Sequence, residues 1–502
     1  MTAIQKVLIA NRGEIAVRII RACRELGIRT VAVYSEADAE SLAVRMADQA
    51  VLIGGAPPSE SYLRGDKIVA AALEMGCDAV HPGFGFLSEN AEFAQAVQQT
   101  GLIFIGPSPD AIRAMGLKTT ALALAERATV PTVPGYRGGG SDDDFARAAD
   151  QIGYPVLVKA AAGGGGKGMR IVRAAAELSA ALESARREAL KAFADERVFL
   201  EKYIETARHI EFQIFADAHG HTLHLGERDC SVQRRHQKII EESPSPAMTP
   251  ALRAEMGSAA VRMAQAVGYI NAGTVEFIVD ERDRRFYFLE MNTRLQVEHP
   301  VTELVTGLDL VHLQFHVATG GALPFTQEQI TQRGHAIECR VYAEDPANQF
   351  LPAIGKLLRV EEPHAPGVRI DSGVVSGDSI TIYYDPMIAK VIVYGTDRAQ
   401  AIRRMLAALA QYVVMGVTTN IPFLRNVLKF PQFVEGNATT GMIEREFGAW
   451  QAPSNTPPDA ALIAAALSEM LTMSAGTKTA TSNPDEDAYS PWAKADGFRL
   501  GA

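Results

Sequence analysis

A β-hairpin that carries two facing glutamates limits how this chain can fold. The strand-like runs Thr274–Val279 and Phe286–Glu290 flank a charged turn, Asp280–Arg284. A hairpin centred near the middle of this turn places Glu276 directly opposite Glu290, and side chains in such positions have Cβ atoms about 5 Å apart. We therefore predict that the two carboxylates lie side by side on one face of a sheet.

Two carboxylates at this distance repel each other unless a cation lies between them, which predicts a metal site. Mg²⁺ prefers oxygen ligands and is usually held by one or two carboxylates together with nucleotide phosphates. Glu276 and Glu290 are the predicted ligands, and Asn292 can add a neutral oxygen. The alternative is a salt bridge to an arginine of the turn, namely Arg282, Arg284 or Arg285.

Polar residues then occupy every second position of the segment 289–300. A period of two puts these side chains on one side wherever the chain is extended. The set offers two carboxylates, two carboxamides and a guanidinium, which suits the binding of a metal ion and an oxyanion. A half-exposed surface strand would alternate in the same way, although such strands favour threonine, lysine and mixed charge. The residues are Glu290, Asn292, Arg294, Gln296 and Glu298.

A glycine-rich segment, residues 162–169, follows the strand-like run Tyr154–Ala160 and precedes another strand. It is not a Walker A loop, because Ala161 and Gly168 stand where glycine and serine or threonine are required, and because no helix follows. Backbone N–H groups without side chains can fold closely over phosphate oxygens. Lys159, at the strand end, adds a positive charge for phosphate. The segment predicts a phosphate-covering hairpin, with a plain flexible loop as the alternative.

A basic cluster interrupts the acidic chain at residues 227–238. Placed near the hairpin, it would offer Gln233, His236 and Lys238 to anionic ligands, whereas a solvated loop is the alternative. The strand-like run Arg208–Phe215 carries His209, which on its own indicates a structural histidine more often than a ligand.

The run Gly334–Tyr342 has Glu338 and Arg340 on one side and apolar residues on the other. The arginine could stabilise an oxyanion or simply pair with Glu338, and both interpretations stay open at this point.

Short strands and helices alternate over the first part of the chain, which predicts a parallel, doubly wound sheet up to about residue 115. The first strand-to-helix turn lacks the GxGxxG pattern, so a dinucleotide site is poorly supported. The expected strands are Lys6–Ala10, Thr30–Tyr34, Ala79–Val80 and Leu102–Ile105, and helices are expected over Glu14–Leu26, over 65–75 and from Asn90.

The composition excludes several classes of protein. The chain has 502 residues, enough for about three domains. Its net charge of −10 argues against a nucleic-acid coat or a binder of anionic membranes. No apolar run approaches the ~18–20 residues needed to span a bilayer, and the start of the chain has no signal-peptide pattern. The four cysteines are far apart and form no CxxC pair, which is typical of a protein in a reducing cytoplasm.

Seven motifs together resemble the biotin carboxylase family, which belongs to the ATP-grasp superfold. They are, in order, IANRGEIAVRIIR, HPGFGFLSEN, MGLKTTA, PVLVKAAAGGGGKGMR, ERDCSVQRRHQKIIEE, FLEMNTRLQVEHPVTE and GHAIECRVYAEDP. The resemblance extends over about residues 4–447. This sequence departs from the family pattern at Phe84, where tyrosine is frequent, and at Lys167, where arginine is frequent.

The resemblance implies a mixed α/β chain (α+β in part) of three domains. These are a Rossmann-like N-terminal domain (residues 1–115), an ATP-grasp domain (116–330) with a glycine-rich lid at about 134–203, and a C-terminal biotin carboxylase domain (331–447). A tail that is partly disordered is expected over 448–502.

The resemblance also implies roles for single residues. The nucleotide would be bound by Lys118, Lys159, Gly165, Gly166, Glu201, Lys202, Tyr203, Ile204, His209, Gln233, His236, Glu276 and Glu290. Magnesium, or manganese, would be held by Glu276, Glu290 and Asn292. Bicarbonate would be held by Lys238, Arg294, Gln296 and Val297. Glu298 would be the general base and Arg340 would face the biotin ureido oxygen, so that the catalytic set is Glu298, Arg294, Lys238 and Arg340.

The implied activity is that of a ligase that carboxylates biotin with bicarbonate and ATP, through carboxyphosphate. The chain lacks a Met-Lys-Met biotin-attachment motif and a segment large enough for a carboxyltransferase. We therefore expect biotin to arrive in trans on a biotin carboxyl carrier protein, with separate carboxyltransferase subunits and no nucleic acid or membrane. A cytoplasmic homodimer is expected, serving acetyl-CoA carboxylase and fatty acid synthesis. Propionyl-CoA or methylcrotonyl-CoA carboxylase is the alternative.

Two other hypotheses compete with this activity. One is an ATP-grasp ligase that joins a carboxylate to an amine, which would need an amine pocket in place of the bicarbonate residues. The other is a non-catalytic nucleotide sensor, which the presence of Glu276, Glu290 and Glu298 disfavours.

Overall fold

The computed structural model describes residues 4–161, 169–193, 195–235, 237–452, 457 and 459–476. These residues belong to two units, and the boundary along the sequence lies between Gln451 and Ala452. The second unit contributes helix α16 (Asp459–Gly476). The glycine-rich segment 162–168 and the predicted disorder of the tail after residue 476 lie outside the described residues. Within these ranges, no helix is both long and apolar enough to cross a membrane.

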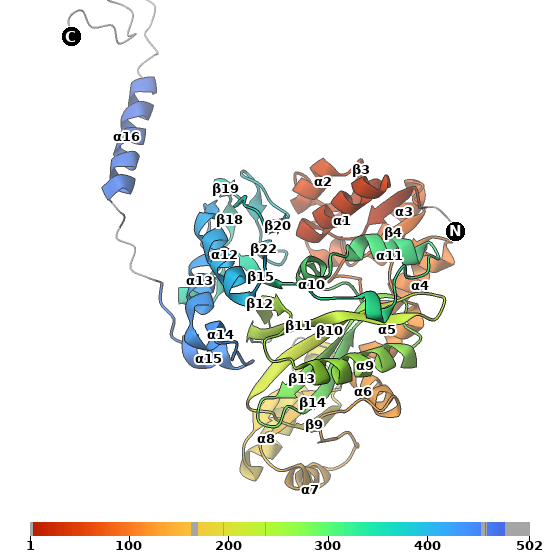
Figure 1. Cartoon of the computed structure of the whole chain (residues 1–502). Helices are drawn as coiled ribbons and strands as arrows, with labels where there is room; N and C mark the ends of the chain where they lie inside the picture. Colours follow the sequence, from red (N-terminus) through yellow and green to blue (C-terminus); the bar gives the residue numbers. More distant parts are fainter. Residues whose placement is uncertain are drawn as a thin grey trace, which may run out of the picture. The chain divides into compact units, whose positions relative to one another are not determined.

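The first sheet is parallel, with the strand order β3-β2-β1-β4-β5. It belongs to the red and orange part of the chain in Figure 1. Apolar residues of α1 pack beside Val7 and Ile9 on one face, whereas α3 and α4 pack beside Leu8 and Val80 on the other. This confirms the predicted doubly wound, Rossmann-like arrangement. The elements are β1 (Lys6–Ile9), α1 (Gly13–Leu26), β2 (Arg29–Ser35), α2 (Leu42–Met46), β3 (Gln49–Gly54), α3 (Gly65–Glu74), β4 (Ala79–His81), α4 (Ala91–Gln99) and β5 (Ile103–Phe104).

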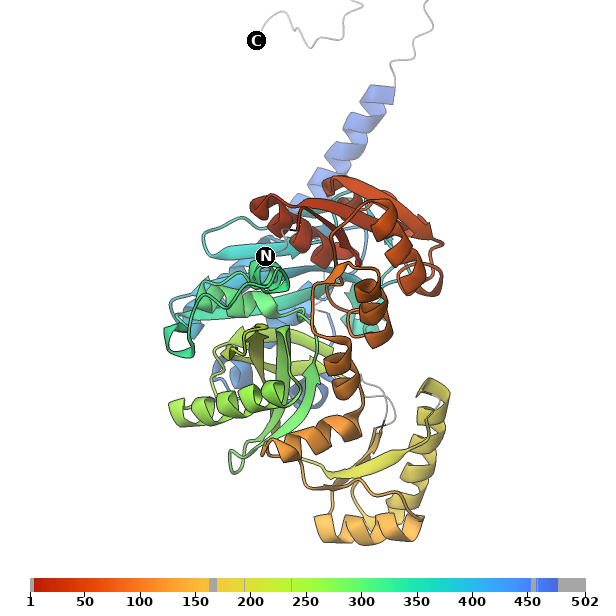
Figure 2. The same ribbon diagram turned by 90° about the vertical axis from the view of Figure 1, so that its right-hand side faces the viewer.

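A second, four-stranded sheet has the order β6-β9-β7-β8. Helices α7 and α8 flank it (Figure 2), and their apolar residues form a core with those of the strands. Two helices, α5 (Pro109–Gly116) and α6 (Lys118–Arg127), lead into this part. Its elements are β6 (Gly135–Tyr136), α7 (Asp142–Ile152), β7 (Val156–Ala160), β8 (Arg170–Val172), α8 (Ala175–Phe193) and β9 (Val198–Lys202).

The largest sheet is antiparallel throughout, with the order β14-β13-β10-β11-β12-β15-β22-β20. Its strands are β10 (Ala207–Ala216), β11 (Thr222–Arg234), β12 (Gln237–Ser243), β13 (Asn271–Asp280), β14 (Phe286–Asn292), β15 (His335–Tyr342), β20 (Val368–Ser372) and β22 (Met387–Gly395). Helix α9 (Pro250–Ala266) covers β10 and β11, and α10 (His299–Thr306) packs on β11, β15 and β22. Helix α11 (Leu310–Ala318) packs against β13 and α1.

The remaining elements belong to the C-terminal part of the first unit. The short strands are β16 (Glu344–Asp345), β17 (Leu351–Pro352), β18 (Gly355–Lys356), β19 (Arg359–Glu361), β21 (Ser379–Ile380) and β23 (Val413–Met415). The helices are α12 (Arg398–Gln411), α13 (Ile421–Lys429), α14 (Pro431–Val434) and α15 (Met442–Phe447).

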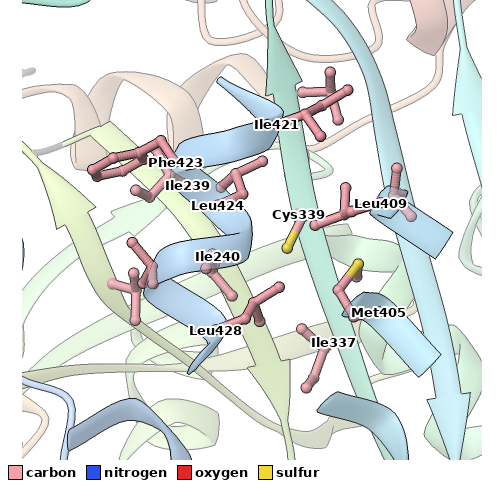
Figure 3. Close-up of a cluster of buried hydrophobic side chains, with 14 of the residues drawn as sticks. Ile239, Ile240, Ile337, Cys339, Met405, Leu409, Ile421, Phe423, Leu424 and Leu428 are labelled. Carbon is pink, nitrogen blue, oxygen red and sulfur yellow. The ribbon is translucent and has the colours of Figure 1, made fainter. Parts of the chain in front are cut away.

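The alternation along β15 separates a hydrophobic core from a polar face. Ile337 and Cys339 are fully buried against Met405 of α12 and Leu424 of α13 (Figure 3). Each such side chain contributes about 1.5–3 kcal/mol when it is fully buried. Because side chains of a strand alternate between its faces, the neighbouring Arg340 points to the opposite side, where the polar residues gather. The predicted two-sided pattern of this strand is confirmed.

The hairpin β13–β14 pairs Glu276 with Glu290, as predicted. The pairing is correct for a reason that the sequence arithmetic did not include. Beyond Glu276 the register shifts by one residue, so that Phe277 faces Phe288 and Leu289 is the extra residue of a β-bulge. Without this bulge the tighter turn would place Glu276 opposite Leu289.

Candidate active site

Lys238, on β12, lies at the centre of a buried group of carboxylates. Its ammonium Nζ contacts Glu211 at 2.5 Å, Glu276 at 2.8 Å and Glu298 at 2.7 Å. Burial alone would lower the pKa of Lys238, but the three carboxylates hold this pKa well above its ordinary value. The basic cluster therefore lies beside the hairpin, and its lysine is a fixed cation in a site of low solvent content.

Glu276 accepts three hydrogen bonds at this centre, from Lys238, from Asn292 at 2.8 Å and from Gln296 at 2.7 Å. It also forms an ion pair with His209, whose Nε2 lies 2.8 Å from Oε2. Burial favours the protonated form, yet the positive charges of Lys238 and His209 hold the pKa of Glu276 well below its ordinary value. The surroundings of Glu276 thus favour its ionised form. The turn arginines do not neutralise it, because they pair with Asp280, Glu281 and Asp283.

Arg228 is a buried member of the site that sequence reasoning missed. It lies on β11, is 0% exposed, and donates to Glu211 at 2.6 Å. Its other acceptors are Gln213, Thr274, Gln296 and Thr302, at 2.7–3.1 Å. Glu211 was also missed, although both residues fall in segments that the sequence pattern had singled out. Arg228 fixes the side chain of Gln296, whose amide in turn donates to Glu276.

Glu298 lies between two cations. One carboxylate oxygen accepts from Lys238 and the other accepts from Arg340, at 2.9 Å. Burial raises the pKa of Glu298, but Lys238 and Arg340 outweigh this effect and hold the pKa well below its ordinary value. Arg340 also donates to Glu241, at 2.6 Å. The simple pairing of Arg340 with Glu338 is therefore wrong, since the guanidinium faces the site instead.

The segment 289–300 is not one continuous strand. This corrects the prediction that its alternating side chains share one face of an extended chain. β14 ends at Asn292 and a loop carries the chain to α10. Gln296 and Glu298 still reach the site, whereas Arg294 turns to Glu89, with Nε and Oε2 at 2.9 Å. Arg294 nevertheless keeps a hydrogen bond to Asn292, at 3.1 Å. Glu89, which belongs to the HPGFGFLSEN motif, is a further residue that sequence reasoning missed.

The oxygen atoms on the hairpin fit a hard divalent cation. Glu290 is half-buried near the end of β14. It faces Glu276, whose Oε2 accepts no hydrogen bond among the described residues and lies 2.8 Å from Nε2 of His209. Asn292 adds a carbonyl oxygen two residues further along β14. Two carboxylates and a carboxamide are ligands that Mg²⁺ prefers, so the donor set agrees with the predicted metal.

A pair of lysines lies next to these acids. Lys159, near the end of β7, is buried and donates to Glu201 of β9 at 2.8 Å. Burial, followed by the charge of Lys159, lowers the pKa of Lys118, and the carboxylates of Glu290, Glu201 and Glu276 oppose this shift. Two neighbouring ammonium groups repel each other, and an anion such as a phosphate group would relieve that repulsion.

The structure describes some, but not all, of the other residues that were predicted to bind the nucleotide. The ammonium of Lys202 donates to the carbonyls of Gly153 and Tyr154, and its backbone N–H donates to the carbonyl of Pro134. Tyr203 is half-buried and Ile204 is buried beyond the end of β9. Gln233 lies 3.4 Å from His209. The predicted residues Gly165, Gly166 and His236 lie outside the described residues.

Together, these groups comprise two lysine ammonium groups that can bind phosphate, a pair of acids that can bind a metal ion, and a carboxylate held between Lys238 and Arg340. Such an arrangement can hold a polyphosphate, a divalent cation and a small oxyanion close together. It can also supply a base at the oxyanion.

The four cysteines, which are buried free thiols, take no part in a disulfide.

Three family models match successive parts of the chain. Residues 3–112 match "Biotin carboxylase, N-terminal domain", residues 118–326 match "Carbamoyl-phosphate synthase L chain, ATP binding domain", and residues 338–445 match "Biotin carboxylase C-terminal domain". Together these matches extend over most of the first structural unit.

Curated proteins and solved structures resemble the chain over nearly its full length. Biotin carboxylase 1 of Bacillus subtilis is 53% identical over 88% of this chain and 98% of its own length. The alpha subunit of mitochondrial methylcrotonoyl-CoA carboxylase of Dictyostelium discoideum is 50% identical over 99% of this chain and 70% of its own length. The biotin carboxylase domain dimer of the 2-oxoglutarate carboxylase of Hydrogenobacter thermophilus, in complex with MgADP, ADP and bicarbonate, superposes with a TM-score of 0.87. It is 47% identical, over 90% of this chain and all of that chain.

Proposed function

Because the chain belongs to the biotin carboxylase family, we propose that it uses ATP and bicarbonate to carboxylate biotin that a separate carrier protein presents. The family is one of ATP-dependent ligases. The observation that carries the proposal for this site is the position of Glu298, whose two carboxylate oxygens accept from Lys238 and Arg340. A carboxylate held between two cations is suited to remove a proton from an anionic substrate that the same cations attract.

In the first step, bicarbonate attacks the γ-phosphorus of ATP and forms carboxyphosphate and ADP. Glu298 takes the proton of bicarbonate, while Lys238 and Arg294 neutralise the dianion that results. Arg294 has to turn from Glu89, its partner in this structure, to do so. Gln296 and the backbone N–H of Val297 orient the same substrate. The fixed cations Lys118 and Lys159 hold the phosphates, as positive charges do in other phosphoryl-transfer sites.

The hairpin residues Glu276, Glu290 and Asn292 would hold the magnesium ion. When bound, the ion neutralises charge on the phosphate oxygens and aligns the transferred group. His209 and Lys238 keep Glu276 ionised in the meantime, so the acid pair is ready for a cation at neutral pH.

In the second step, carboxyphosphate breaks down to carbon dioxide and phosphate, and the phosphate removes the proton of the biotin ring nitrogen. Negative charge then develops on the ureido oxygen. Arg340 has the right charge to stabilise it, and Glu241 holds the guanidinium in place from behind, at 2.6 Å. The carbon dioxide then reacts with the biotin nitrogen.

Purified protein tests this proposal directly. ADP release is measured with magnesium, after dissolved inorganic carbon has been removed and then restored, and with or without free biotin. We expect ATP turnover to require both bicarbonate and magnesium and to rise with free biotin. ATP turnover that proceeds equally without bicarbonate would contradict the proposal, and turnover that depends on an amine would favour the competing ligase activity.

The Arg340→Ala substitution tests the role of this guanidinium. We expect biotin-stimulated turnover to fall by about 10²–10³-fold, the usual cost of removing an oxyanion-stabilising donor. MgATP affinity should change little, because Arg340 contacts none of the lysines that face the nucleotide. Both quantities come from ADP release and from nucleotide titration of the same preparation. Unchanged biotin carboxylation in this variant would remove Arg340 from the mechanism.

The acyl-CoA that finally receives the carboxyl group is a separate question. We propose that the chain serves an acyl-CoA carboxylase, with acetyl-CoA as the predicted acceptor. A methylcrotonyl-CoA carboxylase is a second candidate, because the match to the methylcrotonoyl-CoA carboxylase subunit spans 99% of this chain, whereas the match to the Bacillus biotin carboxylase spans 88%. The complex is purified from the native cells, and transfer of the carboxyl group from its carrier to each CoA thioester is measured. The thioester that accepts the carboxyl group distinguishes these candidates.

A further inference from the structure

The loop that carries Val297 and Glu298 is a tight turn. The backbone N–H of His299 donates to the carbonyl of Gln296 at 3.3 Å. Glu298 has φ −82° and ψ 11°, the values of the third residue in a type I β-turn. The two central residues of this turn are therefore the two that the proposed function assigns to bicarbonate, one through its backbone N–H and one through its carboxylate.

His299 closes this turn from behind. Its Nδ1 lies 2.7 Å from the carbonyl oxygen of Gln296, and its ring is fully buried. A carbonyl only accepts hydrogen bonds, so Nδ1 must carry the proton. Burial, with the nearby charges of Lys390 and Arg18, lowers the pKa of His299 well below its ordinary value and keeps the ring neutral. The bond polarises the peptide whose N–H belongs to Val297.

Lys390 fastens the same turn to strand β22. Its ammonium donates to the carbonyl of Val297 at 2.8 Å and lies 3.2 Å from Glu14 and 3.8 Å from Asp371. The side chain is 0% exposed. On the sheet, Lys390 is the direct partner of Arg340, so one pair of neighbouring residues on β15 and β22 reaches both Glu298 and the turn that carries it.

Other groups hold the side of the turn that faces the substrate site, whereas His299 and Lys390 hold its opposite side. The side chain of Gln296 is held between Arg228 and Glu276, whereas its backbone carbonyl accepts from His299. Neither His299 nor Lys390 has an atom hydrogen-bonded to the carboxylate of Glu298 in the described part of the chain. Within the turn, both contact peptide carbonyls.

We propose that His299 and Lys390 are positioning residues that hold the turn 296–299, and so aim the Val297 N–H and the Glu298 carboxylate at one bicarbonate ion. The inference rests on the proposed function, since it concerns how this chain holds the substrate of that reaction. It predicts a selective effect on bicarbonate, because the lysines that face the nucleotide belong to other elements.

Two matched substitutions at His299 test the inference. In His299→Asn the amide nitrogen takes the place of Nδ1 and can still donate to the Gln296 carbonyl, whereas in His299→Gln the amide lies one carbon further out. We expect the glutamine variant to raise the KM for bicarbonate by about tenfold or more and to lower kcat, in keeping with the cost of small displacements in an active site. The asparagine variant should stay within about threefold of the wild type, and the KM for ATP should change by less than about twofold in both. Bicarbonate-dependent ADP release supplies all of these values.

Lys390→Met provides an independent test, with the same selective rise in the bicarbonate KM expected. His335→Gln is the control, because His335 is another buried histidine, bonded to Glu242 at 2.7 Å and five residues from Arg340 along β15. It should leave the bicarbonate KM unchanged. Thermal melting of each variant shows whether it is folded.

The outcomes distinguish this inference from the proposed function. If wild-type protein requires bicarbonate but His299→Gln keeps the wild-type bicarbonate KM and kcat, the inference is wrong and the proposed function stands. A parallel rise in the ATP KM, or a failure of His299→Asn to preserve activity, would also overturn it, because both indicate a general structural role. If the wild-type protein hydrolyses ATP regardless of bicarbonate, the proposed function fails, and this inference fails with it.

Discussion

Glu298→Gln is expected to lower bicarbonate-dependent ATP turnover by about 10²–10⁴-fold, the range that a general base contributes. The amide keeps the shape of the side chain and one hydrogen-bond acceptor for Lys238 or Arg340, but it cannot take a proton. The loss should appear in kcat at saturating ATP and bicarbonate, measured by ADP release.

The same variant should bind MgATP about as tightly as the wild type. Glu298 makes no hydrogen bond to Lys118, Lys159 or Glu290 in the described residues. Asp283→Asn, in the hairpin turn, is a suitable control, because Asp283 forms its ion pair with the exposed Arg285 and also accepts from the backbone N–H of that residue. A loss of less than about tenfold in Glu298→Gln would be too small for a general base and would assign this role to another group.

The low pKa of Glu298 explains why the base should act only when substrate is present. In the substrate-free protein, Lys238 and Arg340 stabilise the ionised form, so Glu298 is a weak base. An anion bound by Lys238, and a ureido oxygen bound by Arg340, would each withdraw positive charge from Glu298. Its basicity then rises at the moment when bicarbonate must lose a proton. Substrate binding and proton transfer are thereby coupled through two named cations.

The hairpin shows what the sequence could predict about this site. Strand runs, a charged turn and a period of two are local signals, and they were enough to pair Glu276 with Glu290. The extra residue at Leu289 was not predictable, because the sequence contains no local signal for that bulge. The predicted register is correct at Glu276 only because an offset in the turn and the bulge compensate each other.

Residues that act through long-range contacts could not be predicted. Arg228 meets Thr302, which is 74 positions away in the sequence, and Glu89 meets Arg294, which is 205 positions away. No periodicity encodes such contacts, because they depend on how β11, α10 and the N-terminal loops pack. The resemblance to a family supplied the roles of Lys238 and Arg340, but it did not indicate which buried groups hold them. Those roles remain predictions until the substitutions are made.

Arg228→Met is expected to give the largest loss of stability among the substitutions considered. Arg228 is 0% exposed and donates to five side chains, including Glu211, which is also 0% exposed. Methionine of similar length fills much of the space but leaves Glu211 with less compensating charge and several acceptors without donors. Breaking a buried ion pair in this way costs about 3–5 kcal/mol. The free energy of unfolding in urea measures this loss.

Arg282→Met is the matched control for this substitution. Arg282 also pairs with a carboxylate, that of Asp280, at 2.6 Å, but its side chain is 61% exposed. Exposed pairs contribute little to stability because solvent screens their charges, so the control should lose far less stability than Arg228→Met. Equal losses in the two variants would mean that burial of Arg228 does not determine its contribution.

A double substitution tests the physical origin of the loss. If the main cost of Arg228→Met is the uncompensated charge on Glu211, the variant Arg228→Met/Glu211→Gln should be more stable than Arg228→Met alone, by about 1–2 kcal/mol. Lys238 also binds Glu211 and already compensates part of its charge, so the recovery of stability should be incomplete. If packing or the remaining hydrogen bonds dominate instead, the two losses add, as they do for independent sites. A coupling energy that restores stability would therefore mean that Arg228 serves the site mainly as a counter-charge, whereas a coupling energy near zero would mean that it serves mainly as a scaffold.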